Sequence, residues 1–396
     1  MRSSLLVGLF GLIYLTAVSL AASAYGSRHL SAYIVDWNIP KSIPWTKLDH
    51  VIYSFAIPNK DGKLGDFDAN QLKKVVKDAH AHKKGVSLSI GGWSGSLYFS
   101  SLVRTSASRE KFANNLVQAV KTYNVNGLDL DWEYPNNPDG VSCNEKNAND
   151  TPNYLKLIQL LRKKLDAAFP NEHKTISAAV STTVFRDGNQ NPYKKLASGW
   201  KNALDYVNIM AYDLAGPWNP KTSSNSPLYS KNGEESIDSS VKQWVAAGIP
   251  KNRIVVGVPF YGYTALTTSP ATAKSGIKVA YKKGTQIKGD QYDSKGADPC
   301  KGAKSSYSGD VLWKTIASKG IVRSASGWKT VWDSTSQTYF SYAAKTKQFL
   351  TFDDPRSLRA KATYVQKNKL AGVMLWSLDM DDSKNSLLNS LQAVRS

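Results

Sequence analysis

The segment "GLDLDWEYP", residues 127–135, places three acidic residues at alternate positions in a stretch that otherwise has the composition of a buried β-strand. Successive side chains of a strand point to opposite faces, so Asp129, Asp131 and Glu133 are expected on one face. Carboxyl groups on an interior face destabilise a fold unless they share protons, form hydrogen bonds or serve a reaction. A carboxyl group beside other carboxylates has a raised pKa and can act as a general acid. The segment therefore predicts a proton donor, Glu133, at the end of a strand, supported by two aspartates.

Further strand-like segments occur along the whole chain, and amphipathic helical patterns separate most of them. With residues 127–133, the predicted strands are residues 31–37, 50–57, 85–92, 175–182, 206–213, 253–262 and 372–379. The helical patterns are clearest in residues 68–85, which begin at the capping residue Asp68, in residues 151–170 and after the capping residue Asp354. Alternating strands and helices are typical of a parallel sheet, and eight parallel strands close a barrel. We therefore predict the α/β class, with a (β/α)8 TIM barrel.

One connection is much longer than the others, because the seventh predicted strand ends near residue 262 and the next helix begins at Asp354. A structureless loop of that length is uncommon in a compact domain, and residues 328–334 and 338–344 have the composition of strands. Residues 264–347 are therefore expected to form a small inserted α+β domain. Active sites of such barrels lie at the C-terminal ends of the strands, so this insertion should form one wall of a cleft.

The first 24 residues have the pattern of a secretory signal peptide, with Arg2, an apolar run and small residues at Ala22 and Ala24. The apolar run is short for a membrane span, and no basic stop-transfer cluster follows it. We therefore expect cleavage after Ala24 and a secreted, extracellular protein of residues 25–396 without a membrane segment in its mature form.

The composition limits the partners and cofactors that we expect. The formal net charge is +20, but the lysines are spread along the chain, which argues against a nucleic-acid partner. The histidines form no HExxH motif and have no cysteine partners in zinc spacing, so neither a metal nor a cofactor is expected. Cys143 and Cys300 are compatible with one disulfide or with two free thiols in a secreted chain. We expect a monomer.

At the acidic strand the chain resembles glycoside hydrolase family 18, the chitinases. The family pattern DxxDxDxE matches residues 126–133 at three of its four marked positions, with Asn126 in place of the first aspartate. Further family motifs follow in order and spacing, namely "SIGGW" at residues 89–93, "MAYD" at 210–213 and "GVMLWSLD" at 372–379. The resemblance covers residues 29–393, including the insertion, which would then be a chitin-insertion domain.

The resemblance implies cleavage of the β-1,4 bonds of chitin and chitooligosaccharides with retention of configuration. Glu133 would be the general acid/base, while the acetamido oxygen of the substrate attacks the anomeric carbon. Asp131 would orient the acetamido group, and Asp129 would share protons with Asp131. Tyr212 would donate a hydrogen bond to the acetamido oxygen, and Asp213 would tune the acidity of Glu133.

Aromatic side chains at strand ends suit a sugar polymer, because pyranose rings present apolar C–H faces. The resemblance places Trp376 under the scissile sugar. The other residues expected to line the cleft are Trp93, Tyr134, Trp218, Met210, Gly91, Gly92, Tyr33, Phe55 and Tyr261. For the inward-facing aromatic residues and the methionine, a role in filling the barrel core is the alternative.

Two other functions stay open from the sequence. The first is a chitinase-like lectin that binds chitin without cleaving it, which the presence of Glu133 and both aspartates disfavours. The second is an endo-β-N-acetylglucosaminidase that acts on glycoprotein glycans; such enzymes share the acidic motif but commonly lack the insertion. Internal cleavage and cleavage from chain ends are both compatible with these residues.

Overall fold

A closed ring of parallel strands forms the centre of the protein. The computed structural model describes residues 28–231, 233–325 and 327–395, so the predicted signal peptide lies outside the described residues. Around the ring the strands are β1 (His29–Val35), β14 (Gly372–Trp376), β8 (Ile254–Pro259), β7 (Tyr206–Ile209), β6 (Thr175–Val180), β5 (Gly127–Asp131), β4 (Gly85–Gly91) and β2 (His50–Pro58). A β1–β2 pairing closes the ring, and the short β3 (Leu64–Gly65) extends β2 on the outside. The predicted eight-stranded barrel is confirmed.

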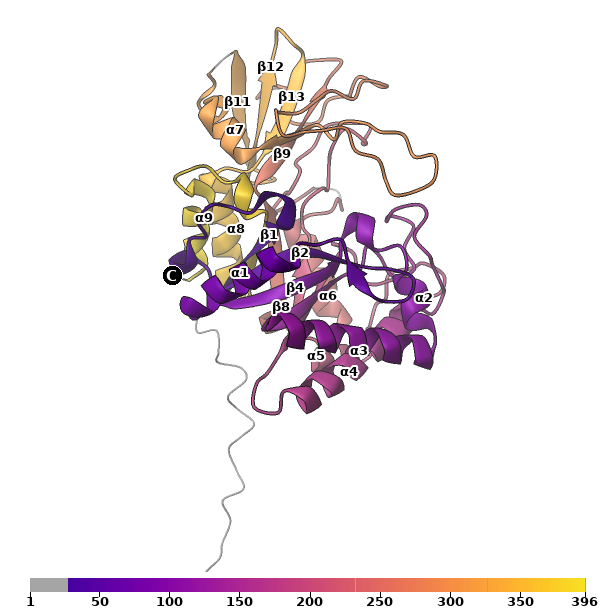
Figure 1. Ribbon diagram of the computed structural model, residues 1–396. Helices are drawn as coiled ribbons and strands as arrows, with labels where there is room; N and C mark the ends of the chain where they lie inside the picture. The colour runs from indigo at the N-terminus through magenta and orange to yellow at the C-terminus, as the bar shows by residue number, and fades with distance from the viewer. Residues whose placement is uncertain (1–27, 232, 326, 396) are drawn as a thin grey trace, which may run out of the picture.

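Helices surround the barrel, as Figure 1 shows. They are α1 (Ala69–Ala81), α2 (Phe99–Arg104), α3 (Ser106–Tyr123), α4 (Asp150–Ala168), α5 (Gly199–Ala203), α6 (Ile237–Ala247), α8 (Pro355–Lys367) and α9 (Ser386–Leu391). Two predicted caps are present: the side chains of Asp68 and Asp354 accept hydrogen bonds from backbone N–H groups in the first turns of α1 and α8. No helix in the described part of the chain combines the length and the apolar composition that crossing a bilayer requires.

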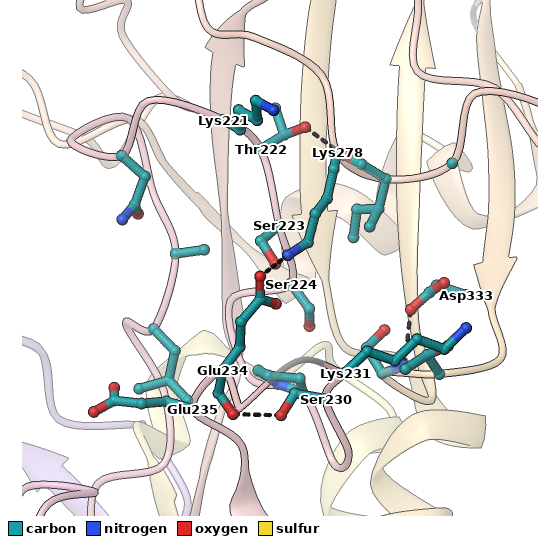
Figure 2. Close-up of a pocket in the computed structure, with 18 of the residues that line it drawn as sticks. Lys221, Thr222, Ser223, Ser224, Ser230, Lys231, Glu234, Glu235, Lys278 and Asp333 are labelled. Atoms are coloured by element: carbon teal, nitrogen blue, oxygen red, sulfur yellow. Dashed lines mark hydrogen bonds and ion pairs between the residues drawn. The ribbon is translucent and has the colours of Figure 1, made fainter.

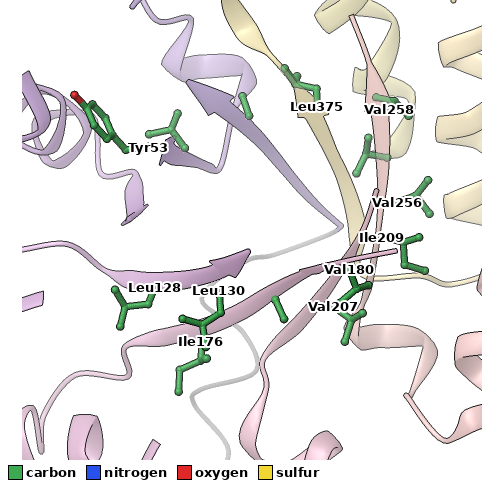
Figure 3. Close-up of a cluster of buried hydrophobic side chains, with 14 of the residues drawn as sticks. Tyr53, Leu128, Leu130, Ile176, Val180, Val207, Ile209, Val256, Val258 and Leu375 are labelled. Carbon is green, nitrogen blue, oxygen red and sulfur yellow. The ribbon is translucent and has the colours of Figure 1, made fainter. Parts of the chain in front are cut away.

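Branched aliphatic side chains on the outer face of the barrel pack against these helices (Figure 3). They include Leu128, Leu130, Ile176, Val180, Val207, Ile209, Val256, Val258 and Leu375, all almost fully buried. Full burial of such a side chain stabilises a fold by roughly 1.5–3 kcal/mol. Successive side chains of a strand alternate between its two faces. Because Leu128 and Leu130 lie on the outer face of the barrel, Asp129 and Asp131 point into it. The apolar half of β5 therefore fixes the direction of its acidic half.

A second, antiparallel sheet lies between β8 and α8 in the sequence. Its order is β10 (Asp310–Leu312), β9 (Tyr261–Leu266), β13 (Gln348–Phe352), β12 (Thr338–Ala343) and β11 (Trp328–Asp333), with α7 (Trp313–Ser318) after β10. Only Phe260 separates β8 from β9, so the sheet stands on the C-terminal end of the barrel (Figure 1). The predicted strand 253–262 is thus two strands, because its second half pairs with β10 and β13 and not with the barrel.

A disulfide joins Cys143, in the loop after β5, to Cys300, in the segment between β9 and β10, with a Cα–Cα distance of 5.6 Å. The two cysteines are 157 residues apart in the sequence, and the disulfide between them connects the barrel to the inserted segment. Of the two states that the sequence left open for these cysteines, the structure contains the bonded one.

Candidate active site

The three acidic side chains line up from the barrel interior to its C-terminal mouth. Asp129 is 0% exposed, Asp131 3% and Glu133 8%. The depth order is the one that the sequence predicts, but β5 ends at Asp131, so Glu133 lies in the following turn and not on the strand. The acids therefore run from the barrel core to its rim.

Asp129 is held by side chains from four other strands. Its Oδ2 accepts hydrogen bonds from the hydroxyls of Tyr33 at 2.7 Å and Ser89 at 2.8 Å. Its Oδ1 accepts hydrogen bonds from the Ser177 hydroxyl at 2.6 Å and the Asn208 amide at 3.0 Å. Burial raises the pKa of Asp129, and these hydrogen bonds oppose the rise. Ser177 and Asn208 were not singled out in the sequence, where no local pattern marks them, and Ser89 was quoted only as the first residue of the "SIGGW" motif, without a role.

Asp131 has the opposite environment. Among the described residues, its buried Oδ1 has no hydrogen-bond partner. Within the described residues, Asp129 accepts its hydrogen bonds from the four donors named above. The structure therefore shows no hydrogen bond between Asp129 and Asp131 through which the two could share a proton. Burial raises the pKa of Asp131 well above its usual range, and the charges of Glu133 and Asp129 raise it further. The unpartnered oxygen is a ready acceptor for a donor on a bound molecule.

Glu133 is a fixed, weakly acidic carboxyl group at the mouth. Its N–H donates to Ser96 Oγ at 2.9 Å, and its carbonyl accepts from the Asn144 amide at 2.8 Å. Burial raises the pKa of Glu133 to about 7; a hydrogen bond with Tyr134 lowers it, and the charge of Asp213 raises it. The sequence attributed the raised pKa to the two neighbouring aspartates, whereas burial and then Asp213 raise it in the structure. A carboxyl group with this pKa is suited to general acid catalysis near neutral pH.

Asp213 is positioned by the inserted sheet. Its backbone has a φ of 59°, in the left-handed region, and its N–H donates to Asn225 Oδ1 at 2.8 Å. Its Oδ1 accepts hydrogen bonds from the phenols of Tyr261 at 2.5 Å and Tyr263 at 2.8 Å, both on β9. Burial raises the pKa of Asp213, and the two phenols lower it. Tyr263 was missed in the sequence, although alternation along β9 places it on the same face as Tyr261.

Tyr212 lies among the acids in a space that a glycine provides. Burial, followed by the charges of Asp131 and Asp213, raises the pKa of Tyr212 well above its usual range. A Cβ at Gly257 would lie 2.5 Å from the Ile209 carbonyl oxygen and from the Met374 methyl group and 2.9 Å from the Tyr212 ring, so this position of β8 leaves no room for a larger residue beside the phenol. The phenol therefore stays protonated and can donate a hydrogen bond to a bound molecule.

Aromatic rings form the floor beside the acids. The Trp376 ring centroid lies 5.3 Å from that of Tyr33 and 5.5 Å from that of Phe55, which it stacks on. A Cβ at Gly92 would lie 2.9 Å from the Phe55 ring, and a Cβ at Gly91 would lie 2.3 Å from the Asp131 carbonyl oxygen. Met210 packs against the same cluster as Tyr33 and Trp376. The structure thus brings these predicted cleft residues together.

Two tryptophans expose their rings at the mouth. Trp93 follows β4 and is 43% exposed, and its indole N–H donates to Asp298 at 2.8 Å. Trp218 follows β7 and is 56% exposed, and its ring packs edge to face on Tyr263 at a centroid distance of 4.9 Å. Exposed aromatic rings of this kind are suited to stacking on sugars.

A separate cavity of about 680 Å³ lies between the loop after β7, residues 275–278 and the turn after β11 (Figure 2). Lys278 pairs there with Glu234, whose carbonyl accepts a hydrogen bond from Ser230. None of the acids of β5 lines this cavity. Within the described residues, no cluster of three or more histidine, cysteine, aspartate or glutamate side chains is arranged to hold a metal ion. We therefore place the chemistry at the barrel mouth.

The chain is similar in sequence and in structure to several known proteins. The sequence pattern described as "Glycosyl hydrolases family 18" matches residues 29–381. A chitinase-like effector of Moniliophthora perniciosa is 32% identical over 91% of this chain and 85% of its own length. Chitinase A1 of Niallia circulans is 29% identical over 89% of this chain and 51% of its own length. The crystal structure of a chitinase from Rhizomucor miehei is 50% identical with a TM-score of 0.90, covering 93% of this chain and 100% of that one.

Proposed function

This chain belongs to glycosyl hydrolase family 18, and we propose that it is a secreted chitinase that hydrolyses the β-1,4 bonds between N-acetylglucosamine units with retention of configuration. The observation that carries the proposal is the pair formed by Glu133, whose pKa is raised to about 7, and Asp131, whose buried Oδ1 lacks a partner among the described residues. One group can donate a proton near neutral pH, and the other can accept a hydrogen bond from the substrate.

The reaction begins with proton transfer from Glu133 to the bridging oxygen, which breaks its bond to the anomeric carbon. The acetamido oxygen of the same sugar attacks that carbon and forms an oxazolinium ion. Asp131 Oδ1 accepts a hydrogen bond from the acetamido N–H and orients the acetamido group for the attack. Water then attacks the anomeric carbon, Glu133 takes up its proton, and the acetamido group is restored. A nucleophile held in place by its own substrate can lower the barrier by roughly 7–11 kcal/mol.

The neighbouring residues hold this arrangement. Tyr212 donates a hydrogen bond to the acetamido oxygen, Asp129 fixes the strand beneath Asp131, and Asp213 keeps Glu133 weakly acidic. Trp376 forms the floor under the scissile sugar, and Trp93, Tyr134 and Trp218 extend the platform along the cleft. The other residues proposed to line the base of the cleft are Tyr33, Phe55, Met210, Tyr261, Gly91 and Gly92. Chitin and chitooligosaccharides are the proposed partners.

The inserted segment, residues 264–347, serves in this proposal as a chitin-insertion domain. The second half of β9 belongs to this segment, and the first half carries Tyr261 and Tyr263, whose phenols reach Asp213 in the site; this supports a role of the segment as one wall of the cleft. A neighbour in structure, the second catalytic domain of a group II chitinase from Ostrinia furnacalis, is described in complex with penta-N-acetylchitooctaose, at 26% identity and a TM-score of 0.75.

Secretion is the remaining part of the proposal. The signal pattern in the first 24 residues supports it, and so does the Cys143–Cys300 disulfide, because disulfides persist in oxidising compartments. Amino-terminal sequencing of the protein recovered outside the producing cell is expected to begin at Tyr25. Recovery of the uncleaved chain inside the cell would contradict secretion.

Glu133→Gln tests the catalytic assignment. Chitohexaose hydrolysis is expected to fall by at least about a hundredfold, the lower range for general acid catalysis, while chitohexaose binding by calorimetry is retained. Glu110→Gln is the matched control, because Glu110 is an exposed residue of α3 that pairs with Lys164. Hydrolysis by Glu133→Gln near the rate of the control would remove Glu133 from the role of proton donor.

A chitin-binding protein without catalysis is the second candidate function. The observation that favours it is that relatives at 32% identity are described as chitinase-like effectors. In that case the unmodified protein would bind chitohexaose and release no product over prolonged incubation. Product release by the unmodified protein, together with its loss in Glu133→Gln, would select the chitinase.

A further inference from the structure

A hairpin of the inserted segment extends from the second sheet over the barrel mouth. Two backbone hydrogen bonds pair Gly296 with Ser306, at 3.0 and 2.9 Å, and define the crossing hairpin as residues 296–306. In Figure 1 the orange segment around residue 300 reaches out from the sheet above the purple half of the barrel.

The base of the crossing hairpin is anchored next to β9. The buried Asp293 carboxylate accepts hydrogen bonds from the N–H groups of Gly289, Ser308 and Gly309 at 2.7 to 3.3 Å. Ser308 and Gly309 lead directly into β10, which pairs with β9 so that Asp310 lies opposite Tyr263. The hairpin therefore starts from the wall that holds Asp213.

The tip of the crossing hairpin is attached to the opposite side of the mouth. Cys300 is bonded to Cys143 in the loop after β5, and the Asp298 carboxylate accepts the indole N–H of Trp93, which follows β4. In the closed ring, β8 and β4 are four strands apart in either direction. A segment that starts at the end of β8 and is bonded to the loops after β4 and β5 therefore joins two opposite sides of the mouth.

We propose that the crossing hairpin is a permanent roof over the substrate cleft, held shut by the Cys143–Cys300 disulfide, so that chitin chains are threaded in from an end. This inference rests on the proposed function, since it assigns the way in which the same site meets its polymer. A long chain can settle sideways into an open cleft at any point along its length. Beneath a covalently closed roof the chain has to pass through by an end, which favours cleavage near chain ends.

The test compares the unmodified protein with the double variant Cys143→Ser/Cys300→Ser on soluble glycol chitin. The measured quantity is the loss of viscosity per new reducing end. It is expected to be at least about threefold larger for the double variant, because its roof can open and admit internal segments of the polymer. Lys301→Ala, which changes an exposed side chain of the same hairpin, is the control and should behave as the unmodified protein. Equal viscosity loss per reducing end in all three proteins would overturn the roof.

A short substrate separates loss of the roof from damage to the acid. The loop that contains Cys143 also supplies Asn144, which holds the Glu133 carbonyl. Chitotriose is short enough to enter under the roof, so its hydrolysis by the double variant should stay within about twofold of the unmodified protein. The double variant could instead lose chitotriose hydrolysis and keep the same viscosity loss per new reducing end. This result would show that the disulfide positions Glu133, and it would contradict the proposed roof.

A binding experiment decides the matter even without hydrolysis. In the Glu133→Gln background, chitohexaose carrying a biotin–streptavidin cap at each end cannot be threaded. It is expected to bind only when Cys143 and Cys300 are also replaced by serine, whereas uncapped chitohexaose binds both proteins. Capped binding with the disulfide intact would refute the roof, while absence of product from the unmodified protein would refute only the proposed function.

Discussion

Asp129 and Asp131 are the same residue type two positions apart, yet the fold gives them opposite environments. Four donors satisfy Asp129, whereas Asp131 Oδ1 is buried without a partner in the described structure. A buried acceptor without a donor is costly to the folded state, because its lost hydration is not replaced. Such a cost is expected at a site where a bound substrate supplies the missing donor.

Tyr263→Phe tests how the inserted sheet controls the acid. Losing one of two phenol donors raises the pKa of Asp213, so Asp213 carries less negative charge at a given pH and its charge raises the pKa of Glu133 less. The alkaline limb of the kcat/KM profile, where Glu133 loses its proton, should therefore move to lower pH.

Tyr281→Phe is the matched control for Tyr263→Phe. Tyr281 is a buried tyrosine of the inserted segment that packs on Phe349 and belongs to the core of the second sheet. Its pH profile should coincide with that of the unmodified protein. An unchanged alkaline limb in Tyr263→Phe, or one moved to higher pH, would disprove the link from β9 to Glu133.

Glu133→Gln should also make the protein more stable at alkaline pH. The folded-state pKa of Glu133, about 7, lies above its usual 4.5, so the folded protein holds this proton more tightly than the unfolded chain. The contribution of Glu133 to the free energy of unfolding is therefore fully present below pH 4.5 and is lost as the pH rises through 7. At pH 8 the glutamine variant should gain as much as about 3 kcal/mol, from about 1.4 kcal/mol per pKa unit. Urea unfolding of both proteins at pH 8 and at pH 4.5 measures this difference in the free energy of unfolding. An equal gain at the two pH values would contradict the raised pKa of Glu133.

At the scale of elements, local sequence patterns predicted where strands and helices form, whereas pairing between residues far apart in the sequence could not be predicted. Alternating apolar runs and caps such as Asp68 and Asp354 predicted all eight barrel strands and helices α1, α4 and α8, whereas α3 and α6 were not singled out. The break at Phe260 could not be predicted, because residues on both sides are equally strand-like and only the distant partners of β9 distinguish them. Ser177 and Asn208 were missed for the same reason, since they lie 48 and 79 residues from Asp129.

A buried ion pair ties helix α8 to the loop that carries Tyr212. Lys361 Nζ lies 2.6 Å from Asp353, at the end of the inserted sheet, and 2.9 Å from Ser226, whose hydroxyl donates to the Ala211 carbonyl. Lys361→Met is expected to lower the free energy of unfolding by about 3–5 kcal/mol, because it leaves a buried carboxylate unpaired. The double variant Lys361→Met/Asp353→Asn should recover part of this loss in urea unfolding. A single variant as stable as the unmodified protein would show that the pair does not hold this junction.

At the scale of the whole molecule, a formal net charge of +20 surrounds a mouth lined by Asp131, Glu133 and Asp213. Fully deacetylated glucosamine oligomers carry amines where the acetamido oxygen is needed, so no oxazolinium ion can form, and the cationic chain is also repelled by the protein. We expect no cleavage of these oligomers when release of reducing ends is compared with that from chitohexaose. Efficient cleavage between two deacetylated units would require a different nucleophile.

The central claim is that the acetamido oxygen of the substrate attacks first and water second. Two successive displacements at one carbon restore the original configuration, whereas direct attack by water inverts it. Proton NMR of chitohexaose during the first minutes of hydrolysis, before the anomers equilibrate, measures this outcome directly. Our account predicts that the new reducing ends appear as the β anomer, and initial formation of the α anomer would contradict it.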